Sequence, residues 1–155
     1  MHYVLAAIYS FLACVGFSIV FEIKKPTFLL VASCIGSIGW VIFVVLEGSV
    51  SPVMQYLYAT MLISVLSELA ARIWKAPATV FLFPGIIPLV PGGGLYYTMT
   101  YLLNGDFAGF AQKGIETASY AGAIAAGVSV VSSIVRLIFW KRSVNILRYK
   151  SSTRP

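Results

Sequence analysis

Three prolines and three glycines interrupt an uncharged stretch of the sequence, and hydroxyl-bearing residues follow directly after them. Proline has no backbone N–H, and its ring clashes with the carbonyl four residues earlier, so each proline frees backbone acceptors. A helix that restarts after such a break presents free N–H groups, which suit a carboxylate. The stretch therefore predicts a substrate-binding or gating site built from Pro84, Gly85, Pro88, Pro91, Gly92, Gly93, Gly94, Tyr96, Tyr97 and Thr98.

Two simpler interpretations of this stretch stay open at the sequence level. The prolines can kink a buried helix for packing, and the tyrosines can belong to an aromatic belt at a membrane surface. Irregular backbone at membrane depth is tolerated only where protein buries it or where it lines a water-filled cavity. Three prolines within eight residues, followed by three glycines, favour a true break over a kink.

Glu68 and Arg72 are a second candidate, because ionisable groups inside an apolar segment are costly and are often functional. They are four residues apart and so share one helix face. Glu68 is a candidate carrier of a coupling proton. The alternative is an ion pair near the cytoplasmic surface, with the Arg72 side chain extended towards the headgroups.

Enzymatic and metal chemistry find no support in the sequence. The only histidine is His2, and the two cysteines, Cys14 and Cys34, lie inside apolar runs. These residues cannot assemble a metal centre, and no nucleophile–base set is present. We therefore expect no catalytic residues, no metal and no cofactor, and the chain is not predicted to be an enzyme.

Composition defines the class of protein. Of the 155 residues 59% are hydrophobic and 10% are charged, with a mean hydropathy of +0.91, whereas soluble domains carry about 25% charged residues. The sequence predicts a single-domain, all-α integral membrane protein. The net charge of +6 is concentrated between apolar runs and at the C-terminus, which is typical of a topology signal and does not indicate nucleic-acid binding.

Five transmembrane helices are predicted. They form a transmembrane domain over 1–140, with a polar loop over 106–116 and a basic cytoplasmic tail over 141–155 that sets topology or contacts anionic membrane lipid. Because Lys- and Arg-rich connections stay cytoplasmic, the cations predict an outside N-terminus and an inside C-terminus in the cytoplasmic (inner) membrane. The predicted spans are 3–21, 27–46, 53–74, 77–105 and 117–139.

The fourth span, which contains the prolines, has an unusual length. As one straight helix the thirty uncharged residues 76–105 would measure about 45 Å, against a hydrocarbon core of about 30 Å. A re-entrant hairpin would place the cationic C-terminal end outside. We therefore expect one crossing made of two shorter helices, near 79–83 and 96–103, with an irregular middle.

The last span carries small residues at steps of three and four: Ser119, Gly122, Ala126, Ser129 and Ser133. Such stripes let helices approach closely in lipid. We expect a packing face, whose partner is either another span of this chain or a second protein.

The segment "SELAARIWKAPATVFLFPGIIPLVPGGGLYYTM", from Ser67 to Met99, resembles the threonine/serine exporter (ThrE-like) family, and within it the small-subunit, YjjB-like type. The most specific part is "AR-x-x-KAPATVF-x-x-PGIIPLVPG". The family's Pro-Gly motif falls on Pro84, Gly85, Pro88, Pro91 and Gly92. Its preceding elements fall on Ala71, Arg72, Ala76 and Pro77.

The resemblance implies a transporter built from two halves of about five spans each, either fused or separate. It implies export of small hydroxy amino acids or of dicarboxylates such as succinate, driven by an ion gradient. This chain resembles the C-terminal half, so a larger YjjP-like membrane subunit is the expected partner. The alternative function is a structural or assembly subunit of such a complex that does not itself transport.

Overall fold

The computed structural model describes residues 2–152, with side chains described for residues 3–138, and the regular secondary structure of this part is helical, without strands. The side chains of the predicted basic tail and residues 153–155 lie outside it. The observed helices are α1 (His2–Val20), α2 (Pro26–Val45), α3 (Pro52–Ile73), α4 (Thr79–Ile86), the 3-10 helix η1 (Ile87–Leu89), α5 (Gly92–Leu103) and α6 (Phe107–Ser152).

The first three helices match the predicted spans to within one residue at each end. Pro26 and Pro52 begin α2 and α3, where a missing N–H costs no helical hydrogen bond. Four helices of the described part are long and apolar enough to cross a membrane, and there is a fifth crossing if α4, η1 and α5 count as one bent span. The all-helical, multi-span class predicted from composition is therefore confirmed.

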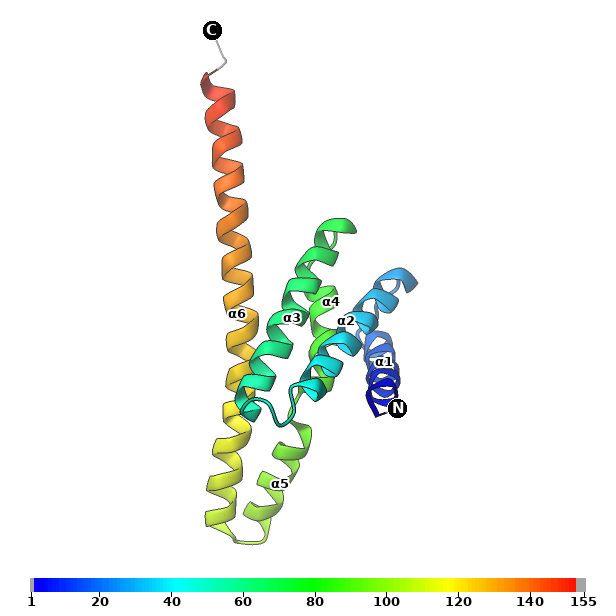
Figure 1. The fold of residues 1–155 in the computed structure, drawn as a ribbon, viewed down its shortest axis with the longest axis vertical. Coiled ribbons are helices and arrows are strands. Elements are labelled where there is room, and N and C mark those ends of the chain that lie inside the picture. The colour runs from blue at the N-terminus through cyan, green and yellow to red at the C-terminus, as the bar shows by residue number, and fades with distance from the viewer. Residues whose placement is uncertain (1, 153–155) are drawn as a thin grey trace.

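The prolines do divide the fourth segment into two helices. The axes of the two pieces differ by 54°, so α5 continues away from the start of α4 and does not fold back beside it (Figure 1). The helical pieces are longer than predicted, and the helical turns stop only at Val90 and Pro91. Pro84 lies inside α4 without ending it.

The predicted polar loop over 106–116 is wrong, because α6 already begins at Phe107. Gly105 has a φ of +74° and ends α5, while the Asp106 N–H donates to the Tyr101 carbonyl oxygen at 3.0 Å. Asp106 then caps the next helix, since its Oδ1 accepts the Gly109 N–H at 2.9 Å. Only a short turn therefore separates α5 from α6.

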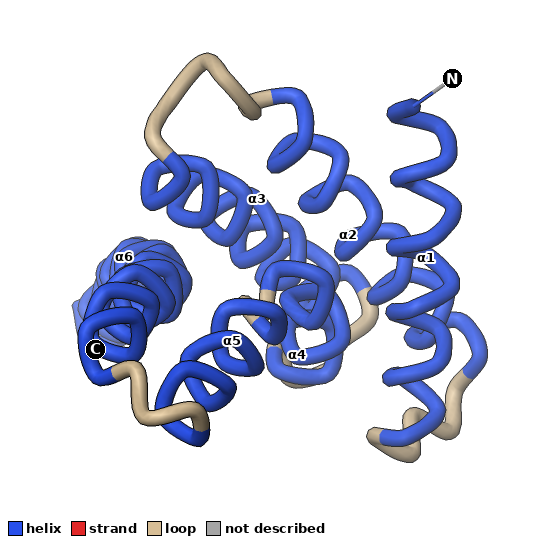
Figure 2. The backbone as a smooth tube through the Cα atoms, turned by 90° about the horizontal axis from the view of Figure 1, so that it is seen from below, coloured by secondary structure: helices blue, strands red, loops and turns tan. Residues whose placement is uncertain are grey.

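Helices α2, α3 and α4 lie between α1 on one side and α6 on the other, as Figure 2 shows along the axis of α6. We call α1 to α4 together with η1 the bundle. We call α5 with the part of α6 beside it, residues 92–118, the α5–α6 arm. The arm projects beyond the bundle at the end opposite the C-terminus (Figure 1).

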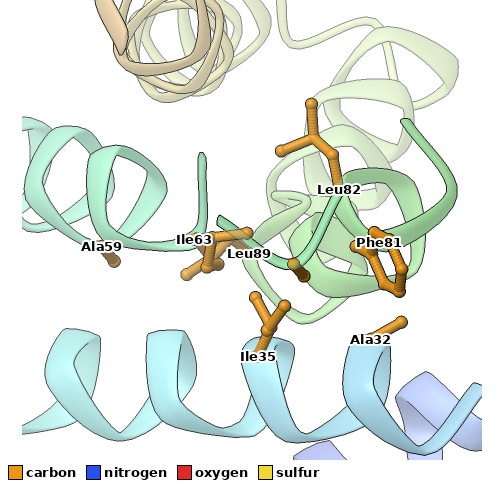
Figure 3. Packing of buried hydrophobic residues seen from close by; sticks show 8 residues of the cluster. Ala32, Ile35, Ala59, Ile63, Phe81, Leu82 and Leu89 are labelled. Atoms are coloured by element: carbon orange, nitrogen blue, oxygen red, sulfur yellow. The ribbon is translucent and has the colours of Figure 1, made fainter. Parts of the chain in front are cut away.

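The buried core belongs to the bundle. Side chains from α2, α3, α4 and η1 meet there (Figure 3), namely Ala32, Ile35, Ala59, Ile63, Ala70, Phe81, Leu82 and Leu89. Glycines allow this close packing. A Cβ at Gly36 would meet the Cys14 sulfur and would lie 2.9 Å from the Gly85 carbonyl oxygen. Helices α1, α2 and α4 therefore cross at van der Waals contact around Gly36 and Gly85.

Candidate functional site

The break in the fourth segment leaves backbone donors without partners. Val90 is extended and Pro91 has a φ of −76° and a ψ of 58°, so neither continues the helix. The Gly92 N–H donates to the Val90 carbonyl oxygen at 2.7 Å, and the Leu95 N–H to that of Pro91 at 3.1 Å. The N–H groups of Gly93 and Gly94 have no acceptor among the described residues. Free donors therefore do lie where the sequence predicted them.

The glycine run does not itself interrupt the helix, as the sequence suggested it would. Gly92, Gly93 and Gly94 form the first turn of α5. Nothing lies within 4 Å of a Cβ added at Gly92 or Gly93, whereas a Cβ at Gly94 would collide with the Thr117 side chain of α6. One side of this turn is therefore open, and its third glycine fits α5 against α6.

The predicted site residues separate into two environments. Pro84 and Gly85 are buried in the bundle, where a Cβ at Gly85 would lie 3.2 Å from Ile63 and 3.5 Å from Ile35. Pro88 is half-buried in η1. The residues of α5, by contrast, include none that is buried. The structure thus places the Pro-Gly motif at a packing joint and the glycine–tyrosine part on an exposed helix.

The hydroxyl groups that follow the break differ in availability. Tyr96 and Tyr97 are 68% and 55% exposed, with their rings 5.5 Å apart. The Thr98 hydroxyl donates to the Gly94 carbonyl oxygen at 2.8 Å, which uses its proton but leaves its oxygen able to accept. The tyrosines are therefore the more available donors for a bound molecule.

A cavity of about 250 Å³ lies beside the break, between Val90, Pro91 and Leu95 on one side and α6 on the other. Its lining is apolar apart from two hydroxyl groups, of Thr98 and Thr117. The Thr117 hydroxyl donates to the Lys113 carbonyl oxygen at 2.7 Å. No charged side chain lines this cavity, so it suits the apolar part of a small molecule rather than its ionic part.

Glu68 and Arg72 lie near the end of α3, away from the break. The Arg72 Nη2 and Glu68 Oε2 atoms are 3.4 Å apart, and the two side chains are 35% and 22% exposed. Such a pair is long and partly solvated, so its electrostatic contribution to stability is small. The structure does not bring these two residues together with α5.

The small-residue stripe of α6 faces outward. Ser119, Gly122, Ala126, Ser129 and Ser133 are all exposed. The opposite side of α6 packs on the bundle through Ala123, Gly127 and Val131, and a Cβ at Gly127 would lie 3.1 Å from the Leu57 carbonyl oxygen and from Thr60. Of the two alternatives from the sequence, packing against another span of this chain is therefore not observed.

A polar pocket in the α5–α6 arm was missed by sequence reasoning. It measures about 460 Å³, and its polar lining consists of Tyr101, Asp106, Gln112, Lys113 and Glu116. The Lys113 Nζ donates to Glu116 Oε2 at 2.8 Å, and the Tyr120 hydroxyl donates to Glu116 Oε1 at 2.7 Å. The signal was present: Asp106, Lys113 and Glu116 are the only charged residues between Lys75 and Arg136.

Three further polar side chains were also missed. Thr60, Ser64 and Ser67 on α3 are buried, and their hydroxyls have no partner among the described residues. Their spacing places them on one face of the helix. They lie at the seam where α3 meets its neighbours, which is where small polar residues concentrate in membrane bundles.

Comparison with known families finds a match. A family model described as "Threonine/Serine exporter, ThrE" matches residues 6–134. Comparisons with curated proteins and with solved structures give no match. The matched residues contain the bundle except for the first residues of α1, together with the break, the α5–α6 arm and the outward stripe of α6.

Proposed function

The chain belongs to the threonine/serine exporter family, and from this premise we propose that it is one subunit of a secondary transporter. Its substrate is a small carboxylate-bearing metabolite, either threonine or serine or a dicarboxylate such as succinate, exported across the cytoplasmic membrane. The observation that carries the proposal is the discontinuous α4–η1–α5 segment within the family match.

The break suits a substrate path for a physical reason. Discontinuous helices in transporters expose half-helix N-termini to anionic groups of a substrate. Here the N–H groups of Gly93 and Gly94 are unpaired at an open helix start, with exposed tyrosine hydroxyls directly after it. We infer that Gly92, Gly93, Gly94, Tyr96, Tyr97 and Thr98 contact substrate. The angle between α4 and α5 is then fixed by Pro84, Gly85, Pro88 and Pro91.

The partner in this proposal is the larger YjjP-like subunit. Two exposed surfaces of the chain are suited to contact a second membrane protein. They are α5, which contains no buried residue, and the outward stripe of α6. Small residues on a lipid-facing surface gain nothing, whereas they let a second helix approach closely. Substrate would then pass between α5 and the partner.

The proposed orientation, with the C-terminus inside, agrees with where the turns lie. The start of α2 and the turn between α3 and α4 lie towards the C-terminal end of the molecule (Figure 1). These connections carry Lys24, Lys25 and Lys75, and Arg72 lies in the last turn of α3 beside the second of them. The α2–α3 connection lies at the other edge of the bundle and the α5–α6 connection lies beyond it (Figure 1), and both are poor in cations, as expected for the outer side.

An efflux experiment tests the proposal. Cells co-expressing this chain and the larger subunit are loaded with labelled threonine, serine or succinate, and efflux is followed after dilution. The double substitution Pro88→Ala and Pro91→Ala should let the helix run through the break and should abolish most of the efflux. Pro26→Ala, at the first turn of α2, is the matched control and should export normally. Unchanged efflux in the double variant would reject the break as substrate path.

A structural or assembly subunit is the second candidate, and the same two exposed surfaces favour it. On that account α5 and the stripe serve only to hold the partner. A photo-crosslinking amino acid placed at position 97 should then label the partner but never a photoreactive substrate analogue. Crosslinking of the analogue at position 97 would instead support the transporting role.

A further inference from the structure

The polar pocket of the α5–α6 arm gathers every charged residue of a sixty-residue segment. Residues 76–135 contain three charged side chains, Asp106, Lys113 and Glu116, and all three line this one pocket. We propose that the pocket is a second substrate site, which binds the ammonium and carboxylate groups of an α-amino acid zwitterion. The proposal rests on the proposed export function and assigns its substrate class.

Two of the three charged groups keep free capacity for a ligand. Lys113 uses one of its three N–H donors on Glu116, so two remain. Asp106 uses Oδ1 to cap α6, so its Oδ2 remains. Glu116 is held from both sides by Lys113 and Tyr120, and this fixes the position of the cation. The pocket thus offers a positioned ammonium and a carboxylate, the complement of a zwitterion.

The balance of charge separates amino acids from dicarboxylates. Two carboxylates and one ammonium give the pocket a formal charge of −1, so a molecule with two carboxylates is repelled while an ammonium group is attracted. Gln112 and Tyr101 add neutral donors and acceptors to the lining, and these suit a hydroxyl group on the ligand. A hydroxy amino acid such as serine or threonine satisfies all of these groups.

The place of the pocket in the fold suggests where on the path it acts. The α5–α6 turn is at the end of the molecule opposite the C-terminus (Figure 1). In the proposed orientation this end faces outward, beyond the break in the direction of export. The pocket is therefore the site from which substrate leaves, and weak binding is expected because an exit site must release its ligand.

Binding to the purified full chain in lipid nanodiscs tests the inference, with L-threonine, L-serine, succinate and the diamine putrescine as probes. Threonine and serine should bind saturably, and the other two should bind more weakly. Asp106→Asn retains the helix cap but removes the charge, and Lys113→Met removes the ammonium. Each should weaken threonine binding by about tenfold, the value of one charge-assisted hydrogen bond.

Glu47→Gln is the charge-matched control, because it removes one carboxylate from the α2–α3 connection, outside the pocket. It should leave threonine binding unchanged. Absence of saturable threonine binding, or equal binding by wild type and both pocket variants, would overturn the proposal. Succinate or putrescine binding as tightly as threonine would overturn the assignment to zwitterions.

Efflux separates this inference from the proposed function. If the Asp106 and Lys113 variants export threonine at the wild-type rate while the Pro88/Pro91 variant does not, the pocket is not on the path and the transporter proposal stands. If the wild-type pair of subunits exports none of the three labelled substrates, the proposed function fails, whatever the pocket binds.

Discussion

The bundle and the α5–α6 arm differ in what their side chains touch. In the bundle, Phe81, Ile63 and Leu89 are enclosed, and α2 approaches the backbone of α4 where Gly36 meets Gly85. In the arm, α5 buries no residue and meets only α6 closely, at Gly94 and Thr117. The bundle encloses a core within this chain, whereas α5 encloses none.

The two halves of the Pro-Gly segment therefore lie in different surroundings. Its first half, around Pro84 and Gly85, is fixed in the bundle, and its second half, from Pro91 onward, begins the arm. A break between a rigid and an exposed helix is a natural hinge, because few contacts resist rotation of the exposed part. We therefore propose that the segment joins a rigid bundle to an α5 helix that can move.

The largest effect should come from the helix crossing in the bundle. In Gly36→Ala the new Cβ meets the Cys14 sulfur and the backbone of Gly85, and backbone atoms cannot move aside easily. We expect a loss of about 2 kcal/mol in the free energy of unfolding. Unfolding of the purified chain by dodecyl sulfate titration in mixed micelles measures it.

The matched control is Gly16→Ala in α1, where nothing lies within 4 Å of the added Cβ. It should be neutral or should stabilise by up to about 1 kcal/mol, because alanine is the better helix former. Equal effects at the two glycines would show that the crossing is not tightly packed, and the contrast between bundle and arm would lose its basis.

The second prediction concerns the uncovered surface. Ala126→Leu places a large side chain in the middle of the outward stripe, so it should reduce co-purification of the larger subunit while leaving unfolding of the isolated chain unchanged. Ala125→Leu, also exposed but turned by about 100° around the helix, should have little effect on co-purification. Loss of stability in the isolated chain would show that the stripe packs within the chain after all.

A break that lines a water-filled cavity would be accessible to a water-soluble reagent. In a background with Cys14→Ala and Cys34→Ala, Gly93→Cys should react with a membrane-impermeant maleimide, because the position is open and its N–H needs a polar partner. Val130→Cys is equally open on α6 but should stay unlabelled, because lipid covers it. Protection of position 93, both alone and with the partner, would contradict a water-filled break.

The ends of the helices could be predicted accurately from the sequence for spans one to three of the bundle, but not for the arm. Spans one to three were predicted to within a residue because hydropathy and proline at the first helical turn mark their ends. The break was also found, because prolines act locally. The start of α6 at Phe107 was missed, although Gly105 and Asp106 form a readable helix stop and helix cap.

What the sequence could not show was which faces meet. The stripe of α6 and the inner set around Gly127 both follow a three-and-four spacing, so periodicity alone cannot tell a face that packs on the bundle from one that faces outward. The polar pocket was hidden for a related reason. Asp106 and Glu116 are ten positions apart in sequence, and only the short turn before α6 brings both beside Tyr101.

The smallest effect is expected at Glu68. This residue lies in the bundle, so it tests whether transport depends on the bundle as well as on the α5–α6 arm. Because the Glu68–Arg72 pair is long and partly exposed, Glu68→Gln should change the free energy of unfolding by less than about 0.5 kcal/mol. If Glu68 is only an ion-pair partner on the rigid bundle, efflux and its dependence on external pH should also match wild type. If efflux or its pH dependence collapses while stability is preserved, the carboxylate takes part in coupling. Function would then reach along α3 into the bundle, and the arm alone could not account for transport.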